Sequence, residues 1–177
     1  MKERIGAPAG AASEQDRIFM QRTLALAWRS RERGRHPFAA IVVDGDGRVV
    51  AEAMNNSMPP EGDPTQHAER LAAAEAARAL TPEALAGCTL YSNAEPCAMC
   101  AGAIYWCGIG RVVYAMSEQA LLRLTGDHPE NPTLSLPCRE VFARGQRSIE
   151  VVGPMPEMAA EAAQAHEGFW NGNESNG

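Results

Sequence analysis

Two short motifs, separated by enough chain for a helix and a strand, supply three metal-binding side chains. The first is His67-Ala68-Glu69, and the second is Pro96-Cys97-Ala98-Met99-Cys100. An imidazole and two thiolates are ordinary zinc ligands, and a zinc ion held by three protein ligands keeps a fourth position for water. A fold that carries both motifs must therefore bring two distant segments together around one ion.

Each motif is expected at the start of a helix. Asp63-Pro64-Thr65-Gln66 has the residue types of a helix start, with an N-cap aspartate and a first-turn proline, and alanine-rich sequence follows to about Leu80. Pro96 likewise predicts a helix start that places Cys97 and Cys100 on one face of the first turn. The positive end of the helix dipole favours the thiolate form of cysteines at that position.

The spacing within the first motif separates the roles of its two ionisable residues. Side chains two positions apart on a helix point about 200° away from each other, so His67 and Glu69 are poorly placed to hold one ion together. This favours His67 as a ligand and Glu69 as a nearby carboxylate that carries protons. Together the two motifs match the H-x-E…P-C-x-x-C pattern, which is typical of zinc-dependent hydrolytic deamination of amino-substituted heterocycles.

Composition agrees with a small globular enzyme and narrows its partners. The chain has 177 residues, 45% hydrophobic and 21% charged, which suits one domain with a buried core. Lys and Arg number 16 against 22 Asp and Glu, and the resulting charge of −6 disfavours a nucleic-acid partner. No apolar run approaches the ~20 residues of a membrane span. The odd cysteine count and the lack of a secretory signal predict a cytoplasmic protein without disulfides.

Outside the motifs, helical and strand patterns alternate. Ser13 begins a helix with an arginine-rich end at 29–35, which we interpret as favourable charge at a helix C-terminus rather than an RNA contact. The turn-rich stretch 125–132 is interpreted as a lid or insertion. A single domain is expected over 13–170, with flexible termini at 1–12 and 171–177. The expected strands and the final helix are 38–43, 48–54, 88–93, 111–115, 148–152 and 157–170.

A closed structural zinc site is the main alternative to a catalytic one. It requires a fourth protein ligand, and Glu69 would then be an ordinary solvated helix residue. The combination of both motifs with their predicted helix starts favours the catalytic site. The remaining cysteines and histidines form no second ligand doublet at a familiar spacing: Cys88, Cys107, Cys138, His36, His128 and His166.

These motifs resemble the cytidine deaminase-like superfamily, within the branch of guanine deaminases and transfer-RNA adenosine deaminases. The resemblance covers roughly residues 25–115 and includes Pro37–Val43, Asn55 and Gly102–Trp106 beside the metal motifs. It implies a three-layer α/β/α sandwich around a five-stranded mixed sheet of order 2-1-3-4-5, with zinc at the C-terminal edge of the sheet. The segment Gly102–Trp106 is more similar to guanine deaminases than to the transfer-RNA enzymes.

The resemblance also implies roles for individual residues. His67, Cys97 and Cys100 would bind one Zn²⁺ ion, and Glu69 would shuttle protons. Phe38 and Trp106 have an alternative interpretation as core residues, and Asn55 as a turn residue. The expected substrate contacts are Asn55, the backbone N–H of Ala68, the rings of Phe38 and Trp106, Glu95, and an acidic lid residue, Asp127 or Glu130.

The implied activity is zinc-dependent hydrolytic deamination of a free nucleobase or nucleoside, with guanine or a related aminopurine favoured. Cytosine and an s-triazine such as ammeline stay open, because each presents an amino group on a ring carbon flanked by nitrogen. A transfer-RNA adenosine deaminase is a further alternative, and a structural-zinc interaction protein is the distant one. The family makes a homodimer the expected state.

Overall fold

The structure is a computed structural model, and it describes residues 10–171. Within these residues a five-stranded sheet of order β2-β1-β3-β4-β5 forms the middle layer. β1 runs antiparallel to β2 and β3, whereas β4 is parallel to β3 and β5, so the predicted mixed sheet and its order are confirmed. The strands are β1 (Ala39–Val43), β2 (Val49–Met54), β3 (Thr89–Ala94), β4 (Arg111–Met116) and β5 (Glu150–Val152).

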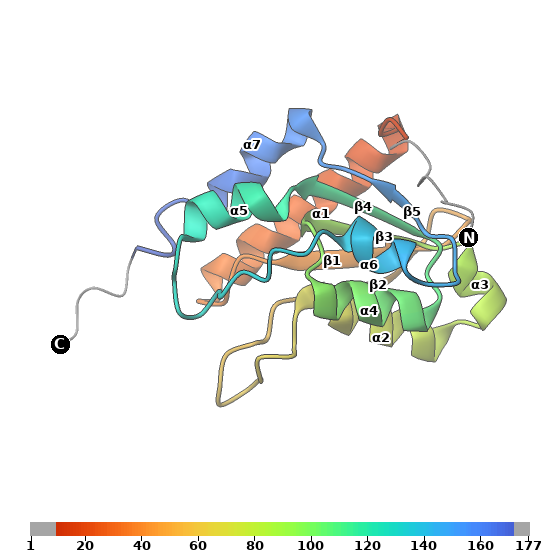
Figure 1. The fold of residues 1–177 in the computed structure, drawn as a ribbon, viewed down its shortest axis with the longest axis horizontal. Coiled ribbons are helices and arrows are strands. Elements are labelled where there is room, and N and C mark those ends of the chain that lie inside the picture. The colour runs from red at the N-terminus through yellow and green to blue at the C-terminus, as the bar shows by residue number, and fades with distance from the viewer. Residues whose placement is uncertain (1–9, 172–177) are drawn as a thin grey trace.

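Helices cover both faces of the sheet, which gives the expected three layers (Figure 1). One face packs against α1 (Glu14–Glu32), α5 (Glu118–Thr125) and α7 (Pro156–Gln164). The other face packs against α2 (Ala68–Ala79), α3 (Pro82–Ala86), α4 (Ala98–Cys107) and α6 (Cys138–Ala143). We call the loop 126–137, between α5 and α6, the lid.

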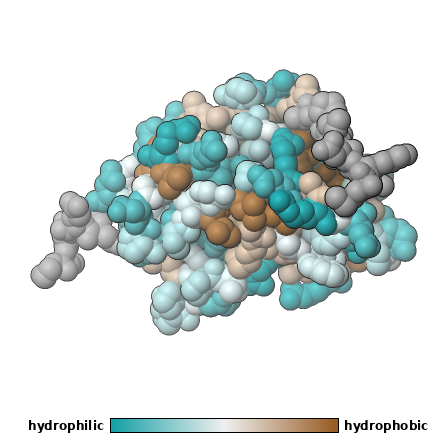
Figure 2. Space-filling model, in the orientation of Figure 1, coloured by the Kyte–Doolittle hydropathy of each residue, from teal (hydrophilic) through white to brown (hydrophobic). Residues whose placement is uncertain are grey.

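The outer surface is mixed in character, and the helices do not match a membrane span. On the face seen in Figure 2, apolar areas are separated by hydrophilic ones. In the described part of the chain, none of the helices is both long and apolar enough to cross a bilayer. The flexible termini that the sequence predicts, 1–12 and 171–177, lie almost entirely outside the described residues.

The first helix begins as its sequence predicts. Ser13 Oγ accepts a hydrogen bond from Asp16 N–H (3.1 Å), and the Asp16 carboxylate accepts one from Ser13 N–H (2.8 Å). This reciprocal pair satisfies N–H groups that have no partner within the helix. Asp16 Oδ1 also accepts hydrogen bonds from Tyr91 Oη (2.9 Å) and Arg111 Nη1 (2.6 Å). The buried start of α1 is thereby tied to β3 and β4.

One arginine of the 29–35 run binds the segment that follows α7. Arg31 Nη1 donates hydrogen bonds to Ala165 O (2.8 Å) and Glu167 O (2.7 Å), which are carbonyls at the end of α7. Gly168, with a φ of 67°, then turns the chain out of a helical conformation. The final helix therefore ends at Gln164, and the prediction that it extends to residue 170 was wrong.

The helix that carries the first metal motif begins later than the sequence predicts. Asp63 does not cap it, because Asp63 Oδ1 accepts hydrogen bonds from Thr65 N–H (2.8 Å) and Thr65 Oγ1 (2.5 Å) within a separate turn. The N-cap of α2 is His67, whose extended backbone (φ −72°, ψ 149°) precedes the first helical residue. Cys97 is the N-cap of α4 in the same way. Both metal motifs therefore lie at helix N-termini, as expected.

Stability in mild acid should depend on the buried side chain of His166. His166 Nδ1 accepts a hydrogen bond from Trp170 Nε1 (3.2 Å), and Nε2 has no partner among residues 10–171. Burial, with the nearby charge of Arg31, lowers the pKa of His166 from 6.5 to about 3. In the unfolded chain His166 binds a proton below about pH 6.5, whereas in the folded protein it does so only near pH 3. Falling pH between these values therefore favours unfolding.

We expect the wild-type protein to lose about 2 kcal/mol more stability between pH 7 and pH 5 than His166→Gln loses. Chemical denaturation at the two pH values measures both losses, and other titrating groups cancel in the comparison. Equal losses in the two proteins would contradict a buried, neutral His166.

Candidate active site

The two metal motifs meet where the N-termini of α2 and α4 face each other. One ligand atom from each of His67, Cys97 and Cys100 lies within 4.8 Å of the others. His67 Nδ1 lies 3.6 Å from Cys97 Sγ, and Cys100 is completely buried. The three predicted ligands are thus brought together by side chains from two helix starts.

The donor set and its spacing fit zinc. Zinc–sulfur bonds of roughly 2.3 Å and zinc–nitrogen bonds of roughly 2.0 Å give a tetrahedral N···S edge of about 3.5 Å. The contact between His67 Nδ1 and Cys97 Sγ, at 3.6 Å, is close to that edge. Among the described residues no fourth histidine, cysteine or carboxylate joins the cluster. This favours an open zinc site over the closed structural site that the sequence left as an alternative.

The two cysteines influence each other's ionisation. The hydrogen-bonding contact with Cys100 lowers the pKa of Cys97 to about 4, and the contact with His67 acts in the same direction against burial. The same contact and burial raise the pKa of Cys100 well above 9. Cys97 is therefore held as a thiolate, which is the form of cysteine that binds metals.

Glu69 lies beside the three ligands in the first turn of α2. Its Oε1 accepts a hydrogen bond from Ser92 Oγ (2.9 Å), and its Oε2 lies 3.6 Å from Cys100 Sγ. Burial raises the pKa of Glu69 above its usual 4.5, since the side chain is 5% exposed. A buried carboxyl group with a raised pKa, next to a metal site, is suited to accept and release a proton.

Two polar residues at the end of β3 hold this arrangement, and the sequence analysis missed both. Ser92 orients Glu69 as described. Asn93 Oδ1 accepts a hydrogen bond from Ala39 N–H (2.9 Å), and Asn93 Nδ2 donates one to Pro37 O (2.9 Å), which fixes the entry into β1. Both side chains are fully buried. A polar pair at the end of an otherwise apolar strand was the signal available in the sequence.

A pocket opens next to the metal ligands. Of the predicted substrate contacts, Asn55, Phe38, Glu95 and Glu130 line it, whereas Ala68, Trp106 and Asp127 do not. The lining side chains come from the metal motifs, from the segments flanking β1 and β2, from the end of β3, and from α5 and the lid: His36, Phe38, Asn55, His67, Glu69, Ala94, Glu95, Cys97, Glu118, Leu121, Glu130 and Asn131.

The structure does not bring Trp106 or Asp127 to the pocket. Trp106 lies at the end of α4, nearly two helical turns beyond Cys100, and is 79% exposed. The expectation that its ring forms a wall of the pocket is not supported. Asp127 is exposed at the start of the lid, and its neighbour Glu130 lines the pocket instead. Ala68 is buried in the first turn of α2, and its backbone contact with a substrate stays a prediction.

Glu95 lines the pocket, but its carboxylate already has protein partners. Glu95 Oε2 accepts a hydrogen bond from Glu118 N–H (3.1 Å), and Oε1 accepts one from Cys138 N–H (3.1 Å). These bonds join the first residues of α5 and α6 to the end of β3. Glu95 thus contacts the two helices flanking the lid, and its expected contact with a substrate stays a prediction.

Glu118 is a pocket residue that the sequence analysis did not foresee. Its carboxyl group has no hydrogen bond or ion pair with other residues of the described range 10–171. Burial, and then the negative charge of Cys97 and Glu69, raises the pKa of Glu118 to about 8. The pocket thus contains two carboxyl groups, Glu69 and Glu118, that exchange protons more readily near neutral pH than ordinary glutamates do.

Comparisons with known proteins place this site in a family. The family described as "Cytidine and deoxycytidylate deaminase zinc-binding region" matches residues 13–116. A probable cytosine deaminase of Schizosaccharomyces pombe is 40% identical over 160 residues, which are 90% of this chain and 95% of the relative. A tRNA-specific adenosine deaminase of Aquifex aeolicus is 40% identical over 101 residues, 57% of this chain and 66% of the relative.

A solved structure agrees over most of the chain. The guanine deaminase of Nitrosomonas europaea matches with a TM-score of 0.65 and 25% identity, covering 90% of this chain and 87% of that one. The fold, the His-Cys-Cys cluster and the matching region together define a zinc-binding deaminase domain. The chain belongs to the cytidine and deoxycytidylate deaminase family. The predicted family and zinc cofactor are confirmed, while the relatives are named for different substrates.

Proposed function

We propose that this protein hydrolytically deaminates a free nucleobase, with guanine as the favoured substrate. The observation that carries this proposal is the closure of the pocket by the chain's own lid. Glu130 Oε2 of the lid meets His36 Nε2 at 2.8 Å, and both residues line the pocket with Asn55. A concave site enclosed by segments of one chain, with a few convergent polar groups, suits a small molecule.

The polar groups of the pocket complement a heterocycle with several N–H groups. Glu130 offers carboxyl oxygens as acceptors, Asn55 offers an amide, and Glu118, whose pKa is raised to about 8, offers an acceptor oxygen together with an O–H donor. Guanine carries more N–H groups than cytosine does, which is the reason for favouring it. Cytosine is the second candidate, because a relative named probable cytosine deaminase is 40% identical and 95% covered by this chain.

Different residues around the pocket would bind the metal and transfer the protons. His67, Cys97 and Cys100 would hold zinc, whose contribution is to lower the pKa of water towards neutrality. Glu69 accepts a proton from the attacking water and passes it to the ring nitrogen; it then takes the remaining proton from the new hydroxyl group on the ring carbon and passes it to the amine, so that the C–N bond breaks and ammonia leaves. Ser92 keeps Glu69 Oε1 occupied, so Oε2, which faces the cluster, is the atom that carries the proton.

An ammonia-release panel tests the proposal. It contains guanine, adenine, cytosine, their nucleosides, ammeline and transfer RNA, and we expect the highest kcat/KM with guanine. Highest activity on cytosine would establish the second candidate. Deamination of transfer RNA alone would overturn the free-base proposal. If no compound released ammonia, the structural-zinc interaction protein would become the favoured alternative.

Two further expectations from the sequence stay proposals. We propose a homodimer, for which the 79% exposed Trp106 on α4 offers an apolar contact surface. A cytoplasmic location is the second proposal, and it rests on the odd number of cysteines.

A further inference from the structure

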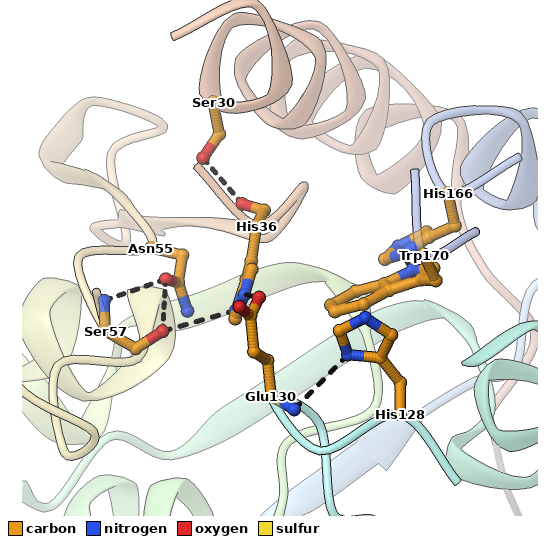
Figure 3. A network of polar contacts seen from close by, with 8 residues as sticks. All are labelled: Ser30, His36, Asn55, Ser57, His128, Glu130, His166 and Trp170. Carbon is orange, nitrogen blue, oxygen red and sulfur yellow. Dashed lines mark hydrogen bonds and ion pairs between the residues drawn. The ribbon is translucent and has the colours of Figure 1, made fainter. Parts of the chain in front are cut away.

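We propose that His36 is a positioning residue that connects the lid carboxyl group of Glu130 to the pocket amide of Asn55 through Ser57 (Figure 3). In this way it sets which hydrogen-bonding atoms the pocket presents to a substrate. The inference rests on the proposed function for the identity of that substrate. Nothing in the metal motifs themselves specifies these contacts.

The connection is a continuous series of short polar contacts. His36 Nε2 lies 2.8 Å from Glu130 Oε2, and His36 Nδ1 lies 3.3 Å from Ser57 Oγ. Ser57 Oγ and Ser57 N–H then both donate to Asn55 Oδ1, at 2.7 and 2.9 Å. The side chains of His36 and Asn55 are buried, Ser57 is half-buried and the Glu130 side chain is 36% exposed, so water competes least in the middle of the connection and most at its lid end. The lid and the loop after β2 are joined through one imidazole ring.

Counting protons fixes the direction of each bond. The backbone N–H of Ser57 must meet an oxygen, which identifies Oδ1 of the Asn55 amide. The hydroxyl of Ser57 has one proton, which it donates to Asn55 Oδ1 in the shorter of its two contacts. His36 Nδ1 must therefore donate to Ser57 Oγ. A second proton is then shared between His36 Nε2 and Glu130 Oε2.

This order of bonds decides what the pocket offers. Asn55 Oδ1 accepts both hydrogen bonds from Ser57 (Figure 3), so the Asn55 amide nitrogen is not used by Ser57. Asn55 is therefore a donor to the substrate, while Glu130 keeps its second oxygen as an acceptor. If the connection were broken, the Asn55 amide could turn over and present its oxygen instead, which would mismatch a substrate carbonyl or ring nitrogen.

Aromatic packing holds the imidazole in the plane that this connection needs. The His36 ring packs against Phe169 (centroids 5.9 Å apart) and Trp170 (4.9 Å) from the end of the chain, and against Phe38 (6.5 Å). Its backbone carbonyl accepts a hydrogen bond from Ser30 Oγ (2.7 Å) in α1. Because the His36 ring is fixed on several sides, it holds Glu130 and Ser57 at set positions instead of moving to follow either one.

A double-mutant cycle tests the proposal in the zinc-loaded enzyme. His36→Gln keeps a polar atom near the Nε2 position, facing Glu130, but removes the donor to Ser57, and Ser57→Ala removes the same link from the other side. We expect each variant to raise KM for the preferred base about five- to tenfold, with kcat within about twofold and zinc content unchanged. The double variant should be no worse than either single variant, because both changes break one link. Effects that multiply, or a loss of kcat alone, would overturn the proposal.

A spectroscopic readout keeps the proposal separate from the proposed function. The side-chain amide resonance of Asn55 should shift in both His36→Gln and Ser57→Ala, and should stay in place in Leu134→Ala, a change at a 58% exposed lid residue outside the connection. An Asn55 side-chain amide resonance that keeps its wild-type position in both variants would refute the positioning role. Absence of ammonia release by the wild-type protein would instead refute the proposed function and leave the amide measurement to decide this one.

Discussion

Glu69→Gln should lower kcat by at least about a thousandfold while the protein keeps its zinc. Glutamine preserves the shape of the side chain and its oxygen can still accept the hydrogen bond from Ser92, but the amide cannot take up and return a proton. Because Glu69 is not one of the three clustered ligands, the metal site should persist. Ammonia release and zinc content, measured on the same preparation, give both numbers.

The matched control for this change is Glu75→Gln. Glu75 lies on the same helix, α2, and is exposed, so the same loss of charge occurs away from the pocket. Wild-type turnover is expected from that variant. Turnover retained in Glu69→Gln, or zinc lost from it, would contradict the role of a proton carrier that is not a ligand.

Cys100→Ala should abolish activity by a different route, through loss of the metal. Cys100 is completely buried at the cluster, and its removal leaves two protein ligands in place of three. We expect zinc affinity to fall more than about 100-fold, since even residues that only support ligands cost 10- to 100-fold when changed. Elemental analysis after dialysis against a chelator measures the loss, and activity should fall in proportion to the zinc.

Cys107→Ala provides the comparison. Cys107 is a free thiol at the opposite end of α4 and does not belong to the cluster. It should retain full zinc and activity under the same dialysis. A Cys100→Ala protein that also kept its zinc would show that the ion is held elsewhere.

The metal ligands could be predicted from sequence because their signal is local. His67 and Cys97 each occupy the N-cap of a helix, and Cys100 follows within one turn, so the motif and the helix start coincide in a short segment. The strands were predictable for a similar reason, since apolar runs bounded by turns need no information from elsewhere. The order of the strands came from the family resemblance and not from the residue pattern.

The predictions that failed depended on contacts between distant segments. Asp63 looks like a helix cap, yet its side chain closes a turn with Thr65. The final helix looked continuous to residue 170, but α7 ends at Gln164, and Arg31 from across the fold binds the carbonyls of Ala165 and Glu167 in the segment that follows. The family resemblance implied that Trp106 forms a pocket wall, whereas the direction of α4 turns that ring to the surface.

The sequence alone determined the chemistry of this protein, and the tertiary structure decided its geometry. One imidazole, two cysteines and a separate carboxylate indicate a zinc-binding site of the deaminase type, because metal preference and proton transfer are properties of those groups. Which oxygen of Glu69 faces the ligands, and which end of the Asn55 amide faces a substrate, depends on Ser92 and Ser57. Hydrogen-bond direction depends on neighbours in space, and those neighbours exist only once the chain has folded.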